Sequence, residues 1–338
     1  MYKKFFMGIA AVAALTLVSC SSDDLNSLSD NSSKNEAISF DGYLGRSAVS
    51  VNGSRGSVEK KDQLKTDGFG VFGNYNSTGG QNFGSNLFNN VKVYSSSTVD
   101  PVIWTYENKK YWPTEGHIDF LAYAPHVDKK QLKGSSIDFT VEGEAANQID
   151  LLWANVTNQT KDNKTVTFNF KHALAKIGYK VQLNGDYTGT TIKLNKITLA
   201  GSKDGTTKKA FYKERIINLS TGAWTPSTSD EKLNFEWFAN NDGTKLTTTA
   251  TDNADNYLFV IPQNFSASAT DQLYVIVDYT ITYSDNTTVK TKVCKQLKKE
   301  FLQGKAYTIN LTIGLTPIEF NATVEGWGDI EDYPITLE

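Results

Sequence analysis

The chain has 338 residues, of which 21% are charged and 12% are aromatic, and its formal net charge at pH 7 is −3. No basic stripe accompanies the aromatic residues, so the composition disfavours binding to nucleic acid. The length suffices for two ordinary domains once an N-terminal leader is set aside.

The N-terminus has the features of a bacterial lipoprotein signal. Two lysines precede an apolar stretch, Phe5 to Val18, that is too short to span a membrane. The stretch runs into Ser19-Cys20, where a lipid-attaching enzyme and its peptidase need a cysteine. We therefore expect residues 1–19 to be a cleaved signal peptide and Cys20 to carry acyl chains, palmitate among them, that anchor the protein. The alternative is an ordinary signal peptide with an incidental cysteine.

Residues 20–36 are rich in Ser, Asp and Asn and nearly devoid of apolar residues, so we expect a flexible, lipidated tether. After the tether, period-two alternation and short β-branched or aromatic runs recur between turn-forming clusters. Thr165 to Leu174 alternates in this way, whereas the next apolar series, which starts at Ile177, is out of phase by one residue. This slip predicts a bulge or a break near Lys176.

Many short strands with turn signals about every ten residues are typical of β-sandwiches. We therefore predict an all-β fold with two consecutive β-sandwich domains, residues 37–175 and 176–338, divided at the slip. The clearest alternation lies at the C-terminal end, in Tyr307 to Leu315 and again beyond Pro317. Such a strand buries one face in a sheet and leaves the other in water. The apolar positions after the proline are Ile318, Phe320, Ala322 and Val324, and a last short run follows at Tyr333, Ile335 and Leu337.

No set of residues in the sequence points to catalysis. The histidines are His117, His126 and His172, and their spacing matches no metal-binding motif. Nucleophile, phosphate and dinucleotide motifs are also missing. We predict no catalytic residue, no metal site and no cofactor, and we expect His172 to be a hydrogen-bonded core histidine.

Five aromatic residues allow an alternative function. They could stack on sugar rings and make the protein a monomeric, glycan-binding outer-membrane lipoprotein, or they could fill the core of a sandwich. The five are Trp104, Tyr106, Tyr111, Trp112 and Trp153.

Several segments together resemble the fimbrillin family, which contains subunits of type V pili and Mfa-like surface lipoproteins. The segments, in order, are Gly68–Gly73, Tyr111–Pro113, Phe120–Pro125, Asp150–Ala154, Phe168–Ile177, Phe259–Gln263 and Gly304–Leu311. Asp23-Asp24, directly behind the tether's first serines, also resembles the surface-export signal of lipoproteins in bacteria related to Bacteroides.

The resemblance implies transthyretin-like sandwiches, a place on the outer membrane or in a fimbrium, and a role in surface adhesion. It also implies that an Arg-specific protease removes the first strand, so that a strand of another fimbrial subunit fills the groove. Arg46 and Arg55 are the candidate cleavage sites, although two surface arginines without such a role remain an alternative. Residues 318–337, and Ile318 to Val324 above all, are the candidate donor, and pairing in cis or in trans stays open. The expected partners are fimbrial subunits, the outer membrane through the lipid, and host or bacterial surface ligands.

Overall fold

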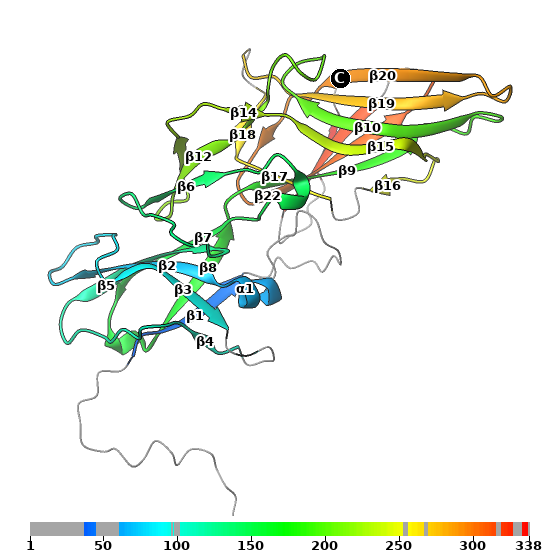
Figure 1. The fold of residues 1–338 in the computed structure, drawn as a ribbon. Helices are drawn as coiled ribbons and strands as arrows, with labels where there is room; N and C mark the ends of the chain where they lie inside the picture. Colours follow the sequence, from blue (N-terminus) through cyan, green and yellow to red (C-terminus); the bar gives the residue numbers. More distant parts are fainter. Residues whose placement is uncertain are drawn as a thin grey trace, which may run out of the picture. The chain divides into compact units, whose positions relative to one another are not determined.

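Residues 37–44, 61–95, 97, 102–252, 256–266, 270–315, 319–326 and 333–336 are the part of the chain described in the computed structural model. Strands and the turns between them make up most of this part, so the all-β prediction is confirmed (Figure 1). Its helical elements are α1 (Lys61–Asp67) and two 3-10 turns, η1 (Ala145–Asn147) and η2 (Lys161–Asn163). A helix able to span a membrane is absent from these ranges.

Seven strands form one sheet in the first half of the chain. Across the sheet they are β1 (Ser39–Leu44), β8 (Thr165–His172), β7 (Leu152–Gln159), β5 (His117–Ala124), β2 (Phe69–Asn76), β3 (Phe88–Ser95) and β4 (Trp104–Thr105). β1 runs parallel to β8, and the other neighbouring pairs are antiparallel. The first and the last of these strands in the sequence are therefore neighbours in the sheet.

β8 shows why the alternating segments become strands. Val166, Phe168 and Phe170 are buried, whereas the residues between them are exposed, because successive side chains of a strand point to opposite faces. β8 ends at His172, Ala173 and Leu174 are outside any strand, and β9 (Ala175–Leu183) follows, in which Ile177 is buried. The predicted change of phase is thus present, a few residues before Lys176.

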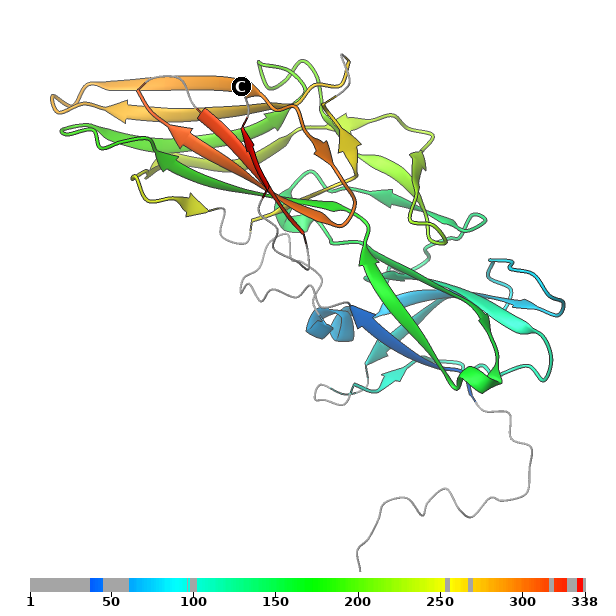
Figure 2. The ribbon, with the colours of Figure 1, turned by 180° about the vertical axis from the view of Figure 1, so that it is seen from behind.

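Two larger sheets form in the second half of the chain. One contains, in order, β16 (Thr251–Asp252), β9, β22 (Lys305–Ile313), β23 (Glu319–Gly326) and β24 (Tyr333–Thr336), with β17 (Leu258–Val260) also paired to β9. The other contains β15 (Phe235–Lys245), β10 (Thr191–Ala200), β19 (Tyr274–Thr282) and β20 (Thr288–Gln296). Figure 2 shows β22, β23 and β24 together, in orange to red.

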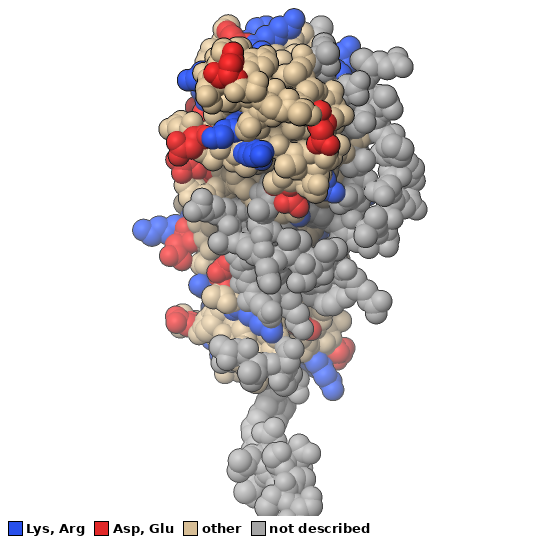
Figure 3. All heavy atoms as spheres, turned by 90° about the vertical axis from the view of Figure 1, so that its right-hand side faces the viewer, with Lys and Arg blue, Asp and Glu red and all other residues tan. Residues whose placement is uncertain are grey.

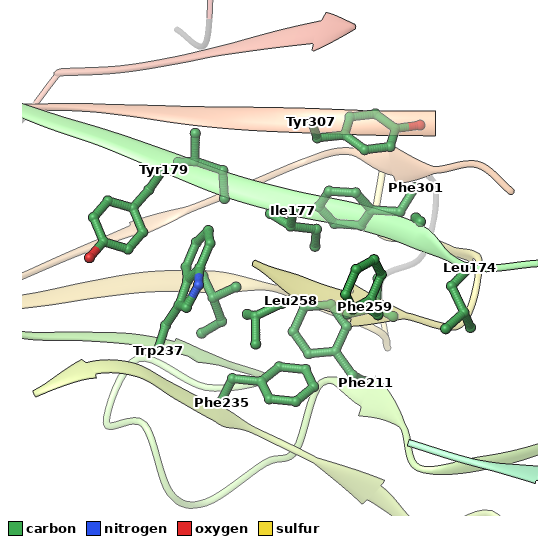
Figure 4. Packing of buried hydrophobic residues seen from close by; sticks show 14 of the residues in the cluster. Leu174, Ile177, Tyr179, Phe211, Phe235, Trp237, Leu258, Phe259, Phe301 and Tyr307 are labelled. Atoms are coloured by element: carbon green, nitrogen blue, oxygen red, sulfur yellow. The ribbon is translucent and has the colours of Figure 1, made fainter. Parts of the chain in front are cut away.

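The interior side chains of these two sheets meet in one apolar cluster (Figure 4). Tyr179 of β9 and Trp237 of β15 pack edge to face, with ring centroids 4.8 Å apart. The Trp237 indole N–H donates to the carbonyl oxygen of Asn256 at 2.8 Å, so this large ring is buried with its polar atom paired.

Three smaller sheets complete the fold. They are β13 (Trp224–Pro226) with β12 (Glu214–Asn218) and β6 (Ser136–Thr140), β11 (Phe211–Tyr212) with β14 (Lys232–Leu233), and β18 (Gln263–Asn264) with β21 (Glu300–Phe301). β6 precedes the predicted domain boundary and β12 follows it, yet the two strands pair over five positions. Residues 36–338 form one compact unit. The boundary at residues 175 and 176 therefore stays a prediction.

Candidate assembly site at the first strand

The backbone of β1 and of Ile38, the residue before it, is hydrogen-bonded to two distant parts of the chain. β1 is the edge strand of its sheet, and its six residues pair with β8, from Ser39 opposite Thr165 to Leu44 opposite Phe170. The Ile38 N–H donates to the carbonyl oxygen of Lys110 at 2.8 Å. The Tyr106 hydroxyl donates to the Ile38 carbonyl oxygen at 2.8 Å, and burial raises the pKa of this hydroxyl. The backbone of Ile38 and β1 is thus held by residues more than 60 positions away in the sequence.

Phe40 places β1 in the middle of an aromatic cluster. It is 4% exposed, and its ring centroid lies 5.4 to 5.9 Å from four other rings. The four rings belong to Phe88, Tyr106, Phe120 and Phe168. Ile38 is 1% exposed and joins the same apolar cluster. Burial of a phenylalanine side chain contributes about 1.5–3 kcal/mol to stability, so Phe40 is the main apolar anchor of β1.

Three other residues complete the fit of β1. Gly42 is buried, and a Cβ built on it would lie 3.2 Å from the Phe69 ring. Asp41 accepts a hydrogen bond from the Trp104 indole N–H at 3.1 Å. The Ser39 hydroxyl donates to the Lys164 carbonyl oxygen at 3.0 Å. We call the surroundings of Ile38 to Gly42, which are β8, Trp104, Tyr106, Lys110 and the rings around Phe40, the β1 slot.

The candidate donor residues lie partly in β23. This strand pairs with β22 of the same chain over eight positions, from Glu319 opposite Thr312 to Gly326 opposite Lys305. β24 pairs with its other side over four positions. Phe320, Ala322 and Val324 are in β23, and Ala322 is 2% exposed. In this structure the strand is therefore paired in cis.

The remaining predicted site residues lie outside the described residues. They are Cys20, Arg46, Arg55 and Ile318. Arg46 and Arg55 belong to residues 45–60, the 16 residues that link β1 to α1 in the sequence. Their predicted roles stay predictions.

The five aromatic residues of the glycan-binding alternative lie mainly in the interior. Tyr106 and Trp112 are each 4% exposed, Trp153 is 7% exposed, and Trp104 is half-buried against Phe69. Tyr111, at 55%, is the exposed one of the five. The interpretation that this group fills the core is thus confirmed for four of its members.

The histidines are all engaged in hydrogen bonds or ion pairs. His172 Nδ1 lies 2.9 Å from Asp150 Oδ2, and the two side chains are 8% and 0% exposed, so the core-histidine prediction is confirmed. His117 Nε2 lies 3.5 Å from Asp119, which is fully buried. Burial lowers the pKa of His126. In the described part of the chain, no three His, Cys, Asp or Glu side chains lie close enough together to hold a metal ion.

The residues of β1 itself were missed by sequence reasoning. Ile38, Phe40 and Gly42 alternate with Ser39 and Asp41, which is the signal that could have found the strand. The run is short and follows the tether directly, and it says nothing about the distant strand that pairs with it.

The chain is similar to known proteins in its sequence and in its fold. A family model described as fimbrillin-like matches residues 57–327. Among solved structures, a candidate cell adhesion protein from Bacteroides uniformis is 19% identical with a TM-score of 0.50, covering 86% of this chain and 98% of its own. At that identity the likeness shows the fold alone. No curated protein matches the chain.

Two further solved structures are less similar. A candidate cell adhesion protein from Bacteroides ovatus is 17% identical with a TM-score of 0.47, covering 91% of this chain and all of its own. The tip fimbrial protein Mfa3 from Porphyromonas gingivalis, in a C-terminally truncated form, is 11% identical with a TM-score of 0.36. The match covers 76% of this chain and 92% of the Mfa3 chain.

Proposed function

Since this chain belongs to the fimbrillin-like family, we propose that it is a subunit of a surface fimbria that serves in adhesion and assembles by strand exchange at the β1 slot. The observation that carries the proposal is the place of β1. It is the first strand of the described residues, yet Phe40 contributes to the centre of the aromatic cluster.

Removal of β1 would leave two unsatisfied surfaces. The edge of β8 would lose a parallel partner over six positions, and the rings around Phe40 would face water. An open strand edge beside an apolar groove is a template for pairing with another chain. An incoming strand with apolar residues at every second position satisfies the backbone and the groove together.

The proposed processing site lies between β1 and α1. A cut after Arg46 or Arg55 would break the covalent link between β1 and the rest of the chain. If Cys20 carries the lipid, the lipid would leave together with β1, since both lie on the N-terminal side of the cut. Cys20 would then serve transport to the surface, and a chain that is not cut would stay anchored to the outer membrane.

The donor in this proposal is the segment from Ile318 to Val324. Its strand has to exchange its cis pairing with β22 for pairing in another subunit. Other fimbrial subunits are accordingly the expected partners, and host or bacterial surface ligands would be bound by the assembled fibre.

The test is to treat the purified precursor with an Arg-specific protease and to look for polymers. We expect a ladder of species that resists SDS without boiling, because a fully paired inserted strand dissociates slowly. The matched control carries Arg46→Lys and Arg55→Lys, keeps the charge, and should remain monomeric. A wild-type chain that is cut and loses β1 but stays monomeric would show that it is not a polymerising subunit.

A further inference from the structure

The candidate donor has the same pattern of apolar residues as the strand that it would replace. β1 and the residue before it read Ile38-Ser-Phe-Asp-Gly-Tyr-Leu44, and the donor reads Ile318-Glu-Phe-Asn-Ala-Thr-Val324. The first and third residues are identical, and the fifth and seventh are close in size. We propose that the β1 slot accepts β23 of a second copy of this chain, in the register that puts Phe320 in the place of Phe40. This inference rests on the proposed strand exchange and adds the identity of the partner and the register.

The aromatic position has the strongest requirement. Phe40 packs against four rings, three of them edge to face and that of Phe168 stacked. A phenylalanine at the same position of the incoming strand regains these contacts, whereas a smaller residue would leave a cavity in the cluster. In the proposed register the incoming β23 runs parallel to β8, as β1 does, and Phe320 supplies the same ring.

The position two residues later requires a small side chain. A Cβ at Gly42 would lie 3.2 Å from Phe69 and 3.5 Å from Trp104 and Phe170, so a methyl group fits with a small shift of a ring edge. Ala322 adds that methyl group and nothing more. The φ angle of Gly42 is not in the left-handed region, so alanine meets no backbone strain there.

This small residue separates β23 from the other alternating strands at the C-terminal end. If Tyr307 of β22 took the place of Phe40, Ile309 would meet the rings around Gly42. If Tyr333 of β24 did so, Ile335 would meet them. Both β-branched side chains are too large for a site that a single methyl group already fills. Period-two alternation alone therefore does not qualify a strand for this slot.

The polar face of the donor matches at one of its two positions. Asp41 Oδ1 accepts the Trp104 indole N–H, and Asn321 offers an amide oxygen at the same position. Ser39 instead donates to the Lys164 carbonyl oxygen, a hydrogen bond that the carboxylate of Glu319 cannot make. Asn321 thus keeps the acceptor for Trp104, whereas the exposed hydrogen bond at position 39 is lost.

A chain whose donor matches its own slot is complementary to itself. The donor and the slot are different surfaces, so each added copy leaves a new donor free and the contact does not close on itself. The expected product is a fibre of identical subunits, which makes this chain a repeating stalk component.

The test traps the register by a disulfide between two copies. An acceptor variant carries Asn169→Cys on β8, and a donor variant of different size carries Thr323→Cys, both with Cys294→Ser to remove the exposed native thiol. Tyr43 of β1 pairs with Asn169 of β8. In the proposed register residue 323 takes the place of Tyr43, so it lies opposite residue 169. The matched control is an acceptor with Thr167→Cys, two residues away on the same exposed face of β8. Opposed residues can form a disulfide, whereas a pair shifted by two residues is too far apart.

After Arg-specific cleavage and mixing, we expect a disulfide-linked dimer of the two sizes with Asn169→Cys and none with Thr167→Cys. Cross-linking with Thr167→Cys alone would overturn the register. Loss of β1, seen by mass spectrometry of the folded protein, with no cross-link in either mixture would overturn the second copy as partner, while strand exchange with a different subunit would stand. Retention of β1 after cleavage and mixing would refute both the strand exchange and this inference.

Discussion

At the scale of single residues, the β1 slot depends on the large ring of Phe40 and on the lack of a side chain at Gly42, two positions later. Phe40 fills the aromatic cluster, and Gly42 lets Phe69 and Trp104 approach the backbone of β1. Either property can be changed in the uncleaved chain, where β1 is in place, so the slot can be studied without any assembly.

Phe40→Ala should destabilise the uncleaved protein by about 3–5 kcal/mol, because it leaves a cavity among packed rings. The measurement is urea-induced unfolding of the mature chain. Tyr111→Ala is the control, since Tyr111 is an aromatic residue that is 55% exposed, and it should cost far less. Equal losses for the two variants would show that Phe40 does not anchor β1.

Gly42→Ala should change the stability of the uncleaved chain by less than about 1 kcal/mol, because the added methyl group fits and alanine restricts the unfolded chain. Gly42→Leu should cost about 1–3 kcal/mol or more through overpacking against Phe69 and Trp104. Thermal unfolding of both variants gives the comparison. A loss with alanine as large as that with leucine would mean that the slot has no room for Ala322.

At the scale of elements, pairing decides which parts of the chain a protease can reach. β12 is paired on one side with β6 and on the other with β13, so both edges of its backbone are occupied. Arg215 lies in β12, is 6% exposed, stacks on the Tyr212 ring and pairs with Asp230 at 2.9 Å. A protease needs an extended, unpaired segment, which β12 offers after unfolding.

We therefore expect an Arg-specific protease to leave the bond after Arg215 intact in the folded protein. The same protease should cut there once the chain is denatured in urea. Mass spectrometry of the fragments distinguishes the two cases. Cleavage after Arg215 in the folded state, at the rate seen in urea, would show that β12 opens readily.

The elements also show how far the sequence could predict the fold. The change of phase between Phe170 and Ile177 was visible in the sequence because alternation is a local property of each strand. The pairing of β1 with β8 was not visible, since Ser39 and Thr165 are 126 positions apart and only the folded sheet brings them together. For the same reason, the sequence marked Trp104 as a candidate sugar platform, whereas the structure uses its indole N–H to hold Asp41.

At the scale of the whole molecule, exposed charges and buried hydroxyls behave differently. Acidic and basic side chains are interspersed on the face shown in Figure 3, in keeping with the net charge of −3. The interior instead holds several tyrosines. Burial raises the pKa of each, to about 12 for Tyr123 and Tyr179. The others in this group are Tyr106, Tyr279 and Tyr307.

These tyrosines should make the protein sensitive to alkali. The unfolded chain loses its phenolic protons near pH 10, whereas the folded chain keeps them to higher pH, so the folded state then binds more protons. Stability should be unaffected by these groups below pH 10 and should fall between about pH 10 and 12. Urea unfolding at a series of pH values measures the fall, and Tyr179→Phe should reduce it. Stability that stays constant or rises over this range would contradict the prediction.

The way β1 is held has a consequence for timing. Because the strand is kept by ladder hydrogen bonds and by Phe40, a cut beyond Leu44 leaves two polypeptides in one folded complex. Loss of the short polypeptide is a first-order process whose rate is independent of concentration, while capture of a strand from another molecule is second order. After the cut, the loss of β1 would therefore impose a delay that does not depend on concentration. Fibre growth would then be fastest where the concentration of exported molecules is high. A weakened hold on β1, as in Phe40→Ala, would shorten the delay before growth without altering the rate of the cut.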